Sequence, residues 1–220
     1  RDSDLNIALV GANTVTGPSG SGSGASDGIF AYGPTELIDL TISGDGSLTV
    51  TGGGTVSGSF GICTDNLIVQ SGTVNATGGD GAEDSYGIYA YNDVTITNGD
   101  VTATSGDSAD YSCGIYADYG NIDVSGGTVI AGGGDSGDNS DGICVSKDGI
   151  TISGGEVTTT GGDTEGRSCG IDADSITING GVFTAIGKTG TEGSYGIYTG
   201  ALTITGGTIT ATGNTSGVYG

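Results

Sequence analysis

A chain of 220 residues with a formal net charge of −22, four Lys or Arg residues and no His repels nucleic acids and anionic membranes. Without His, a Ser-His-Asp nucleophile triad of the usual kind is excluded. No apolar run approaches the ~18 residues of a membrane-spanning helix, so we expect no membrane insertion.

The N-terminal part, residues 1–24, alternates apolar and polar residues at 6–10 and again at 14–16, which predicts two short strands. A Gly/Ser-rich stretch at 17–24 follows, and we interpret it as a long loop. Residues 25–60 predict a longer, irregular first coil with a bulge at 33–36 and a tight turn at Asp45-Gly46. Because the chain begins at Arg1 without Met, it is either a mature secreted form or an excerpt of a longer polypeptide.

Regular repeats occupy residues 61–220, and the clearest is SYGIYAYNDVTITNGDVTATSGD at 85–107. Each repeat predicts three short strands separated by corners rich in Gly, Asn and Asp, residues that tolerate a positive φ. A Gly-Ile step marks each repeat, and its glycines lie at Gly28, Gly61, Gly87, Gly114, Gly142, Gly170 and Gly196, with a Gly-Val variant at Gly217. The sequence therefore predicts one all-β domain over 1–220, a parallel β-helix (β-solenoid) of about eight coils of ~27 residues. The rule for parallel crossovers favours a right-handed helix.

Stacked inward columns should form the core. In the second strand they are Leu67/Val69, Val94/Ile96, Ile122/Val124, Ile150/Ile152, Ile176/Ile178 and Leu202/Ile204, and in the third Val74/Ala76, Val101/Ala103, Val129/Ala131, Val157/Thr159, Phe183/Ala185 and Ile209/Ala211.

The phrases ITISGGEVTTTGGD, LTITGGTITATG, SYGIYA and LVGANTVTG resemble the repeats of secreted, surface-exposed bacterial proteins described as carbohydrate-binding domain-containing. The resemblance covers nearly the whole chain. It implies an extracellular or cell-surface parallel β-helix, and it brings no catalytic motif to carry over.

An outward aromatic column is the first candidate site. Two residues after the repeat Gly stand Phe30, Tyr89, Tyr116, Tyr198 and Tyr219, with Cys63, Cys144 and Asp172 in the other repeats. Exposed aromatic rings beside carboxylates could stack on sugars and bind their hydroxyl groups. The alternatives are a stacking ladder that stiffens the sheet, or a contact surface between rods.

An acidic corner is the second candidate site. Asp80, Asp107, Asp135 and Asp163 follow Gly-Gly or Ser-Gly at the same place in successive coils. Carboxylates stacked ~4.8 Å apart repel, and a Ca²⁺ ion with oxygen ligands would relieve the repulsion. Side chains that spread into water would relieve it equally, and no complete EF-hand loop is present.

The four cysteines, Cys63, Cys113, Cys144 and Cys169, resist intrachain pairing. Cys113 and Cys169 share a column but lie two coils apart, ~9.6 Å by strand spacing, beyond the ~7 Å limit between Cα atoms in a disulfide. Free thiols and bridges between rods both remain open.

Two less favoured functions remain. Columns of Thr, among them Thr102, Thr158, Thr184 and Thr210, are similar to an ice-binding face, but Ile130 interrupts them. A carboxylate pair such as Asp172 and Asp174 could in principle hydrolyse glycosides. The scattered Lys and Arg residues offer no grouped lyase base, so we expect no enzyme.

The two ends of the chain together would complete one coil, since residues 217–220 have the pattern of a first strand and residues 4–16 that of a second and a third strand. Candidate subunit contacts are Ile7, Leu9, Val15, Val218 and Tyr219. We therefore expect an extracellular structural protein whose copies stack head-to-tail into a filament, or one segment of a longer covalent array. A carbohydrate-binding or adhesin module is the alternative. No cofactor is required, apart from a possible Ca²⁺.

Overall fold

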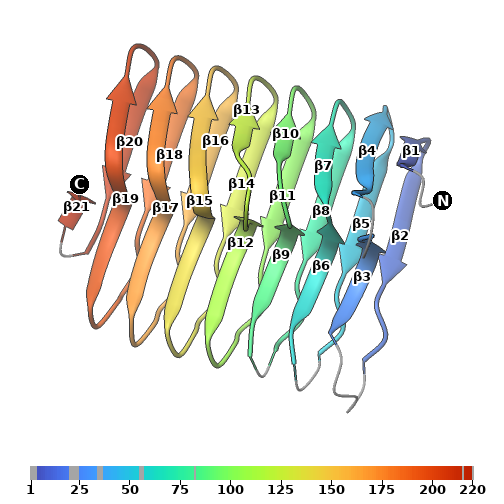
Figure 1. Cartoon of the computed structure of the whole chain (residues 1–220), viewed down its shortest axis with the longest axis horizontal. Helices are drawn as coiled ribbons and strands as arrows, with labels where there is room; N and C mark the ends of the chain where they lie inside the picture. Colours follow the sequence, from blue (N-terminus) through green and yellow to red (C-terminus); the bar gives the residue numbers. More distant parts are fainter. Residues whose placement is uncertain are drawn as a thin grey trace.

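The computed structural model describes residues 4–19, 25–33, 37–54, 57–81 and 83–214, together with the backbone of Ser216–Tyr219. The chain winds into a rod of stacked coils (Figure 1). Among the described residues no helix is long and apolar enough to cross a membrane. The bulge at 33–36 and the Gly/Ser-rich stretch at 20–24 lie largely outside the described residues.

Each complete coil contributes a first, a second and a third strand. The separate first strands are β3 (Ser26–Ala31), β6 (Ser59–Thr64), β9 (Ser85–Ala90), β12 (Tyr111–Ala117) and β21 (Ser216–Tyr219). The separate second strands are β1 (Leu5–Leu9), β4 (Asp39–Gly44), β7 (Asn66–Val69), β10 (Val94–Ile96) and β13 (Ile122–Val124). First and second strands are joined in β15 (Asn139–Ile152), β17 (Arg167–Ile178) and β19 (Gly193–Ile204). The third strands are β2 (Ala12–Thr16), β5 (Ser47–Thr51), β8 (Thr73–Thr77), β11 (Asp100–Thr104), β14 (Thr128–Gly132), β16 (Glu156–Thr160), β18 (Val182–Ile186) and β20 (Thr208–Thr212).

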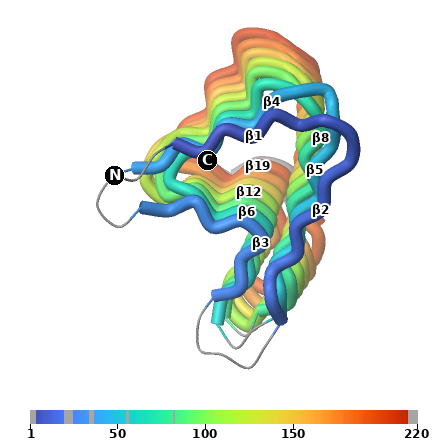
Figure 2. The backbone as a smooth tube through the Cα atoms, turned by 90° about the vertical axis from the view of Figure 1, so that its right-hand side faces the viewer, coloured from blue at the N-terminus to red at the C-terminus, as the bar shows by residue number. Residues whose placement is uncertain are grey.

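All strand pairs are parallel, and equivalent residues of successive coils pair in register, as in Ile88 with Ile115. The third strands form one sheet of eight strands, while the first and second strands form a sheet of thirteen. Figure 2 looks along the rod and shows three walls. The first strands, among them β6 and β12, form the first wall; the second strands, among them β1 and β4, form the second; and the third strands, among them β2, β5 and β8, form the third. The expected parallel β-solenoid is confirmed.

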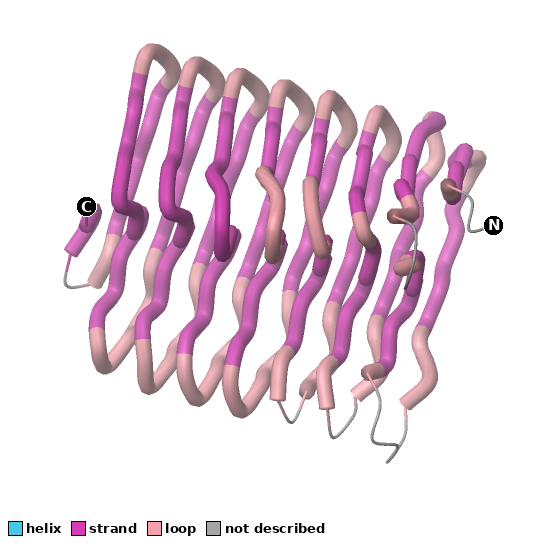
Figure 3. The backbone as a smooth tube through the Cα atoms, viewed as in Figure 1, coloured by secondary structure: helices cyan, strands magenta, loops and turns pink. Residues whose placement is uncertain are grey.

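The expected separation of each coil into three strands is wrong for the coils of β15, β17 and β19, where no corner separates the first strand from the second (Figure 3). Three residues lie between Ala90 and Val94, which is enough for a turn, but only Asp174 and Ser175 lie between Ala173 and Ile176. Because two residues leave little room for a turn, β17 continues from the first wall into the second as one bent strand. β15 is also continuous, although four residues lie between Val145 and Ile150, and its register against β17 shifts there.

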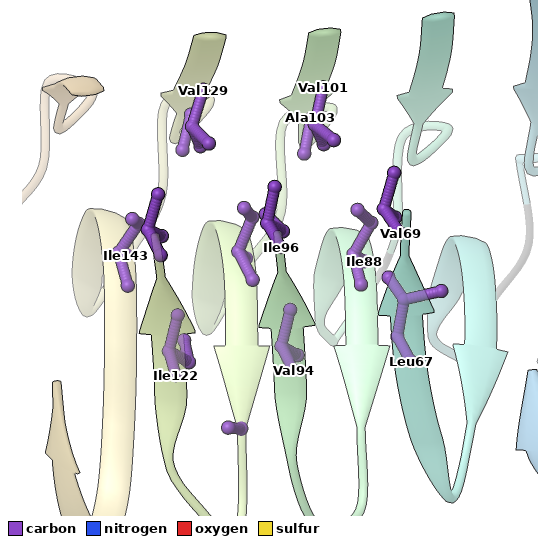
Figure 4. Close-up of a cluster of buried hydrophobic side chains, with 14 of the residues drawn as sticks. Leu67, Val69, Ile88, Val94, Ile96, Val101, Ala103, Ile122, Val129 and Ile143 are labelled. Atoms are coloured by element: carbon purple, nitrogen blue, oxygen red, sulfur yellow. The ribbon is translucent and has the colours of Figure 1, made fainter. Parts of the chain in front are cut away.

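The expected inward columns form the core (Figure 4). Ile88, Val94 and Ile96 are fully buried, and their equivalents stack on them along the rod. The columns become exposed in the last coil, where Ile204 is 50% exposed while Ile178 beneath it is fully buried.

The glycine of the Gly-Ile step permits a close approach of two strands. A Cβ atom added at Gly87 would lie 2.6 Å from the backbone nitrogen of Thr104 and 2.7 Å from the carbonyl oxygen of Gly114. Only a residue without a side chain fits between the first and third walls at this point. Positive φ values occur instead at the corner before the third strand, as at Gly72 with a φ of 87°. The expectation that Asn and Asp would share this role is wrong, because every described residue with a positive φ is Gly.

A column of buried serines, which the sequence analysis missed, joins the acidic corners to the first wall. The Ser85 hydroxyl donates to the carbonyl oxygen of Gly79 at 2.8 Å and accepts from the backbone N–H of Gly106 at 2.8 Å. Ser140 forms the same pair of bonds with Gly134 and Gly162. Ser stands two residues before the repeat Gly in seven coils, at Ser26, Ser59, Ser85, Ser112, Ser140, Ser168 and Ser194, and all seven are buried.

Replacing one of these serines should destabilise the rod. Ser85→Ala leaves one backbone carbonyl and one N–H without their partner, which costs about 1–3 kcal/mol when such groups are buried. Thermal or denaturant unfolding of the variant measures the loss. The control is Ser125→Ala, because Ser125 is exposed, and its replacement should change stability by less than about 0.5 kcal/mol. Equal stability of both variants would contradict a structural role for the serine column.

Candidate functional site

The Gly-Ile step turns two consecutive residues inward and so brings two outward columns together. Gly87 faces the third wall and Ile88 is fully buried, so Tyr86 and Tyr89 on either side both point outward. Their ring centroids lie 5.8 Å apart although three positions separate them. In Figure 2 the first wall, with labels β3, β6 and β12, bends instead of running straight. We call the surface between the two columns the groove.

Strand pairing defines both columns. The column before the Gly contains Asp27, Phe60, Tyr86, Cys113, Asp141, Cys169 and Tyr195, and the column after the Gly-Ile step contains Phe30, Cys63, Tyr89, Tyr116, Cys144, Asp172 and Tyr198. The sequence analysis expected only the second column. The signal for the first lay in the variable residue of Ser-X-Gly-Ile, which is Asp, Phe, Tyr or Cys in different coils.

Aromatic rings fill the groove over β6, β9 and β12, and we call this part the aromatic section. The Tyr86 ring is stacked between Phe60, at 5.2 Å, and Tyr116, at 5.0 Å with an interplanar angle of 9°. Tyr89 stacks on Phe60 and Tyr116 at 5.5 Å each. These rings cover one another and Tyr89 and Tyr116 are half-buried, so this part of the expected outward column forms the stacking ladder that was the alternative to a sugar-binding surface.

The other members of the expected column lie apart from this stack. Phe30 is 63% exposed and contacts Tyr32 at 6.0 Å. Tyr198 contacts Tyr195 at 5.2 Å and lies under the guanidinium of Arg167 at 4.2 Å. The side chain of Tyr219 lies outside the described residues, although its backbone pairs with Tyr198.

A pocket of about 500 Å³ opens along the aromatic section. Its polar groups are carboxylates, and Asp118 accepts from the hydroxyls of Tyr89 and Tyr116 at 3.4 Å each. Burial raises the pKa of Asp84. The lining residues are Phe30, Tyr32, Phe60, Cys63, Asp84, Tyr86, Tyr89, Tyr91, Tyr116 and Asp118. The pocket thus combines apolar ring surface with acceptors for hydroxyl groups.

Thiols and carboxylates replace the rings over β12, β15 and β17, and we call this part the thiol–acid section. Asp141 lies between Cys113 and Cys169 in the column before the Gly, while Cys144 and Asp172 are neighbours in the other column. Asp141 is only 5% exposed, and its Oδ1 has no hydrogen-bond partner. A second pocket, of about 380 Å³, borders this section.

The charges of the thiol–acid section are only partly balanced. Arg167 forms an ion pair with Asp172 at 3.4 Å. Burial, reinforced by the charge of Asp172, raises the pKa of Asp141 well above its usual range. Burial also raises the pKa of the Asp172 carboxyl, against the opposing effect of Arg167. Burial thus disfavours the charged form of both carboxyl groups, and a further cation would oppose this effect.

All four cysteines are free thiols. This agrees with the spacing of the columns, which resists an intrachain disulfide. Burial is the largest cause that raises the pKa of each, to about 12 for Cys63. The register adds a reason that the sequence analysis missed, because Asp141 occupies the position between Cys113 and Cys169.

The acidic corners form a ladder of hydrogen bonds. The Asp107 carboxylate accepts the backbone N–H of Asp135 at 3.0 Å, and Asp135 accepts that of Asp163 at 3.0 Å. Asp80 and Asp163 continue the ladder at its two ends. These bonds give the four carboxylates a structural role without an ion, and Ca²⁺ binding there stays a prediction.

The candidate subunit contacts are placed only in part. Leu9 is 2% exposed and so is already covered within the chain, whereas Ile7 and Val15 are half-buried against the core. The side chains of Val218 and Tyr219 lie outside the described residues.

Comparison with known proteins agrees with the coiled architecture. A family described as Beta helix repeat matches residues 94–115, 150–174 and 202–220. Each matched segment begins at a second strand and reaches the next first strand, so the match follows the period of the coils. No curated protein and no solved structure matches the chain. The family match supports a β-helix repeat and says nothing about carbohydrate binding.

Asp27, at the N-terminal end of the groove, should make stability depend on pH. Burial raises its pKa from 3.8 to about 6, and its Oδ1 has no hydrogen-bond partner. The folded state therefore holds a proton more tightly than the unfolded state. This contribution is fully present below about pH 4 and is lost as the pH rises to about 6.

We expect Asp27→Asn to raise the midpoint of thermal unfolding at pH 7, on the order of 2 °C, and to flatten its change between about pH 4 and 6. Unfolding scans in a chelator across this range provide the measurement. Asp123→Asn, at an exposed position, is the control. Parallel curves for wild type and Asp27→Asn would show that Asp27 is not the group responsible.

Proposed function

We propose that this protein is an extracellular, non-enzymatic solenoid that binds glycans in the aromatic section of its groove. The observation that carries the proposal is the joint presence of aromatic rings and the carboxylates Asp84 and Asp118 in one pocket of about 500 Å³. Sugar rings offer C–H faces to aromatic surfaces and hydroxyl groups to acceptors, which is the chemistry that this pocket provides. The resemblance to repeats of secreted proteins supports the extracellular location.

The available ring surface lies at the N-terminal end of the aromatic section. Tyr86 is covered on both sides, by Phe60 and by Tyr116. Phe30 is 63% exposed, and its neighbour Tyr32 contacts Tyr91 edge to face at 5.7 Å. A sugar would therefore pack on Phe30 and Tyr32, while the stacked rings keep the pocket rigid.

The surface charge restricts the class of glycan. With a net charge of −22 and carboxylates at the pocket, the groove repels uronic acids and sulfated sugars. We propose neutral oligosaccharides as ligands.

An array of neutral and acidic glycans, followed by calorimetry on the best ligand, tests this function. We expect binding of neutral oligosaccharides only, and a loss of about tenfold or more in affinity for Phe30→Ala combined with Tyr32→Ala, which corresponds to about 1.4 kcal/mol. Tyr111→Ala is the matched control, because Tyr111 is 44% exposed and does not line this pocket. The absence of any neutral ligand on a broad array would refute the function, and unchanged affinity of the double variant would refute the site.

Stacking of copies into a filament is the second candidate function. The observation that favours it is the exposed core of the last coil, where Ile204 is 50% exposed and Leu202 and Ile209 are half-buried. Parallel strands of another coil could cover these residues. That coil could belong to a second copy or to the same polypeptide.

Electron microscopy together with a denaturing gel separates these cases. If copies stack, native material should form rods that fall apart into chains of ~21 kDa on the gel, and Ile204→Lys should disperse them because it places a charge in the junction. Thr203→Lys is the control on the adjacent outward position. Dispersed single particles from the wild type would contradict stacking.

A further inference from the structure

The thiol–acid section places metal-binding atoms from two neighbouring strands at one point. Asp141 on β15 and Cys169 and Asp172 on β17 each present one ligand atom, and these atoms lie within 4.8 Å of one another. A cation bound at ~2.0–2.3 Å separates its ligand atoms by roughly 3.5 Å, so small side-chain rotations suffice. Within the part of the chain that the structure describes, no other group of three His, Cys, Asp or Glu side chains meets this condition.

An unpaired oxygen marks the same point independently. Asp141 is 95% shielded from solvent, with an exposed fraction of 5%, yet its Oδ1 has no hydrogen-bond partner. Buried polar atoms are normally paired because an unpaired one costs free energy. A pocket of about 380 Å³, which Asp141, Cys144 and Asp172 line, lies beside this carboxyl group.

The charges favour a divalent ion. Two carboxylates and one thiolate carry three negative charges, and Arg167, paired with Asp172 at 3.4 Å, supplies one positive charge. A divalent cation brings the local sum to zero. The net charge of −22 further raises the concentration of cations near the surface.

The donor set selects the kind of ion. Ca²⁺ and Mg²⁺ take oxygen ligands, whereas a thiolate together with carboxylates suits a borderline-soft cation such as Zn²⁺. We propose that Asp141, Cys169 and Asp172 bind one divalent cation of the Zn²⁺ class at the thiol–acid section. Water from the neighbouring pocket completes the shell.

Binding converts the Cys169 thiol to a thiolate. The sulfur–metal bond forms as the S–H proton passes to the buffer, and no electrons are transferred. The reaction therefore releases protons, and its apparent enthalpy depends on the ionisation enthalpy of the buffer.

The test uses the full chain, reduced and freed of metal with a chelator. Titration with Zn²⁺ by calorimetry in two buffers should give one site per chain with proton release, and a rise in the unfolding midpoint because the ion binds the folded state. Titration with Cd²⁺ should produce the ultraviolet charge-transfer band of a thiolate–cadmium bond. Ca²⁺ at the same concentration should leave the cadmium band unchanged, because Ca²⁺ takes oxygen ligands and does not displace Cd²⁺ from a thiolate.

Three variants locate the site. Cys169→Ser should abolish the cadmium band. Both Cys169→Ser and Asp141→Asn should weaken Zn²⁺ binding at least ~100-fold, which exceeds the usual loss of metal affinity when a residue that only hydrogen-bonds to a ligand is replaced. Asp172→Asn serves in place of Asp141→Asn if that variant does not fold, as judged by circular dichroism in chelator. Cys63→Ser is the matched control, because Cys63 is a buried groove thiol on β6, far along the rod from β17.

Two results would overturn the proposal. One is a cadmium band and Zn²⁺ affinity in Cys169→Ser equal to those of the wild type. The other is loss of the cadmium band on addition of an equal concentration of Ca²⁺, which would show that the site does not prefer a thiolate-binding ion.

Discussion

The close approach of the first and third walls at the Gly-Ile step is the constraint on which this rod depends. With a Cβ atom only 2.6 Å from a backbone nitrogen, no side chain fits at Gly87. The two walls therefore meet backbone to backbone, and the core beside them takes an Ile and a small residue from the first strand, such as Ile88 and Ala90, and a Val/Ala pair from the third. Buried serines secure the adjoining corner, since Ser85 and Ser140 each bond the corner before their own first strand and the equivalent corner of the next coil.

The groove is a consequence of that same contact. Strict alternation would place the outward residues two positions apart on a flat wall. Because Gly and Ile both face inward, the outward residues are three positions apart and converge, as the 5.8 Å between the rings of Tyr86 and Tyr89 shows. Repetition of the step along the rod extends this convergence into two parallel columns. The element that closes the core thus also creates the groove.

Period and alternation were sufficient to predict the parallel solenoid and nearly all of its buried columns, because strand stacking requires equivalent residues to pair in register. The candidate site was only half predictable. The column of Tyr89 and Tyr116 was found, but the second outward column, with Tyr86 and Asp141, was not recognised, because alternation does not reveal that the strand departs from period two at Gly-Ile. The acidic corners show the opposite difficulty: their spacing indicated repulsion, whereas hydrogen bonds from backbone N–H groups to Asp107 and Asp135 are visible only in three dimensions.

Comparison of the coils with one another separates architecture from specificity. Ser, Gly and Ile are the same in seven successive copies of Ser-X-Gly-Ile, and each has a structural cause in the wall contact, the corner or the core. The X position and the position after Ile share the same backbone and the same outward direction, yet they vary among Asp, Phe, Tyr and Cys. If these positions served only solubility, Thr and Asp would suffice along the whole rod, as they do on the outward positions of β10 and β13. Instead, large rings are grouped over β6, β9 and β12, and thiols with buried carboxylates are grouped over β12, β15 and β17. Such grouping, which the scaffold does not require, is what distinct binding sections on one rigid groove would produce.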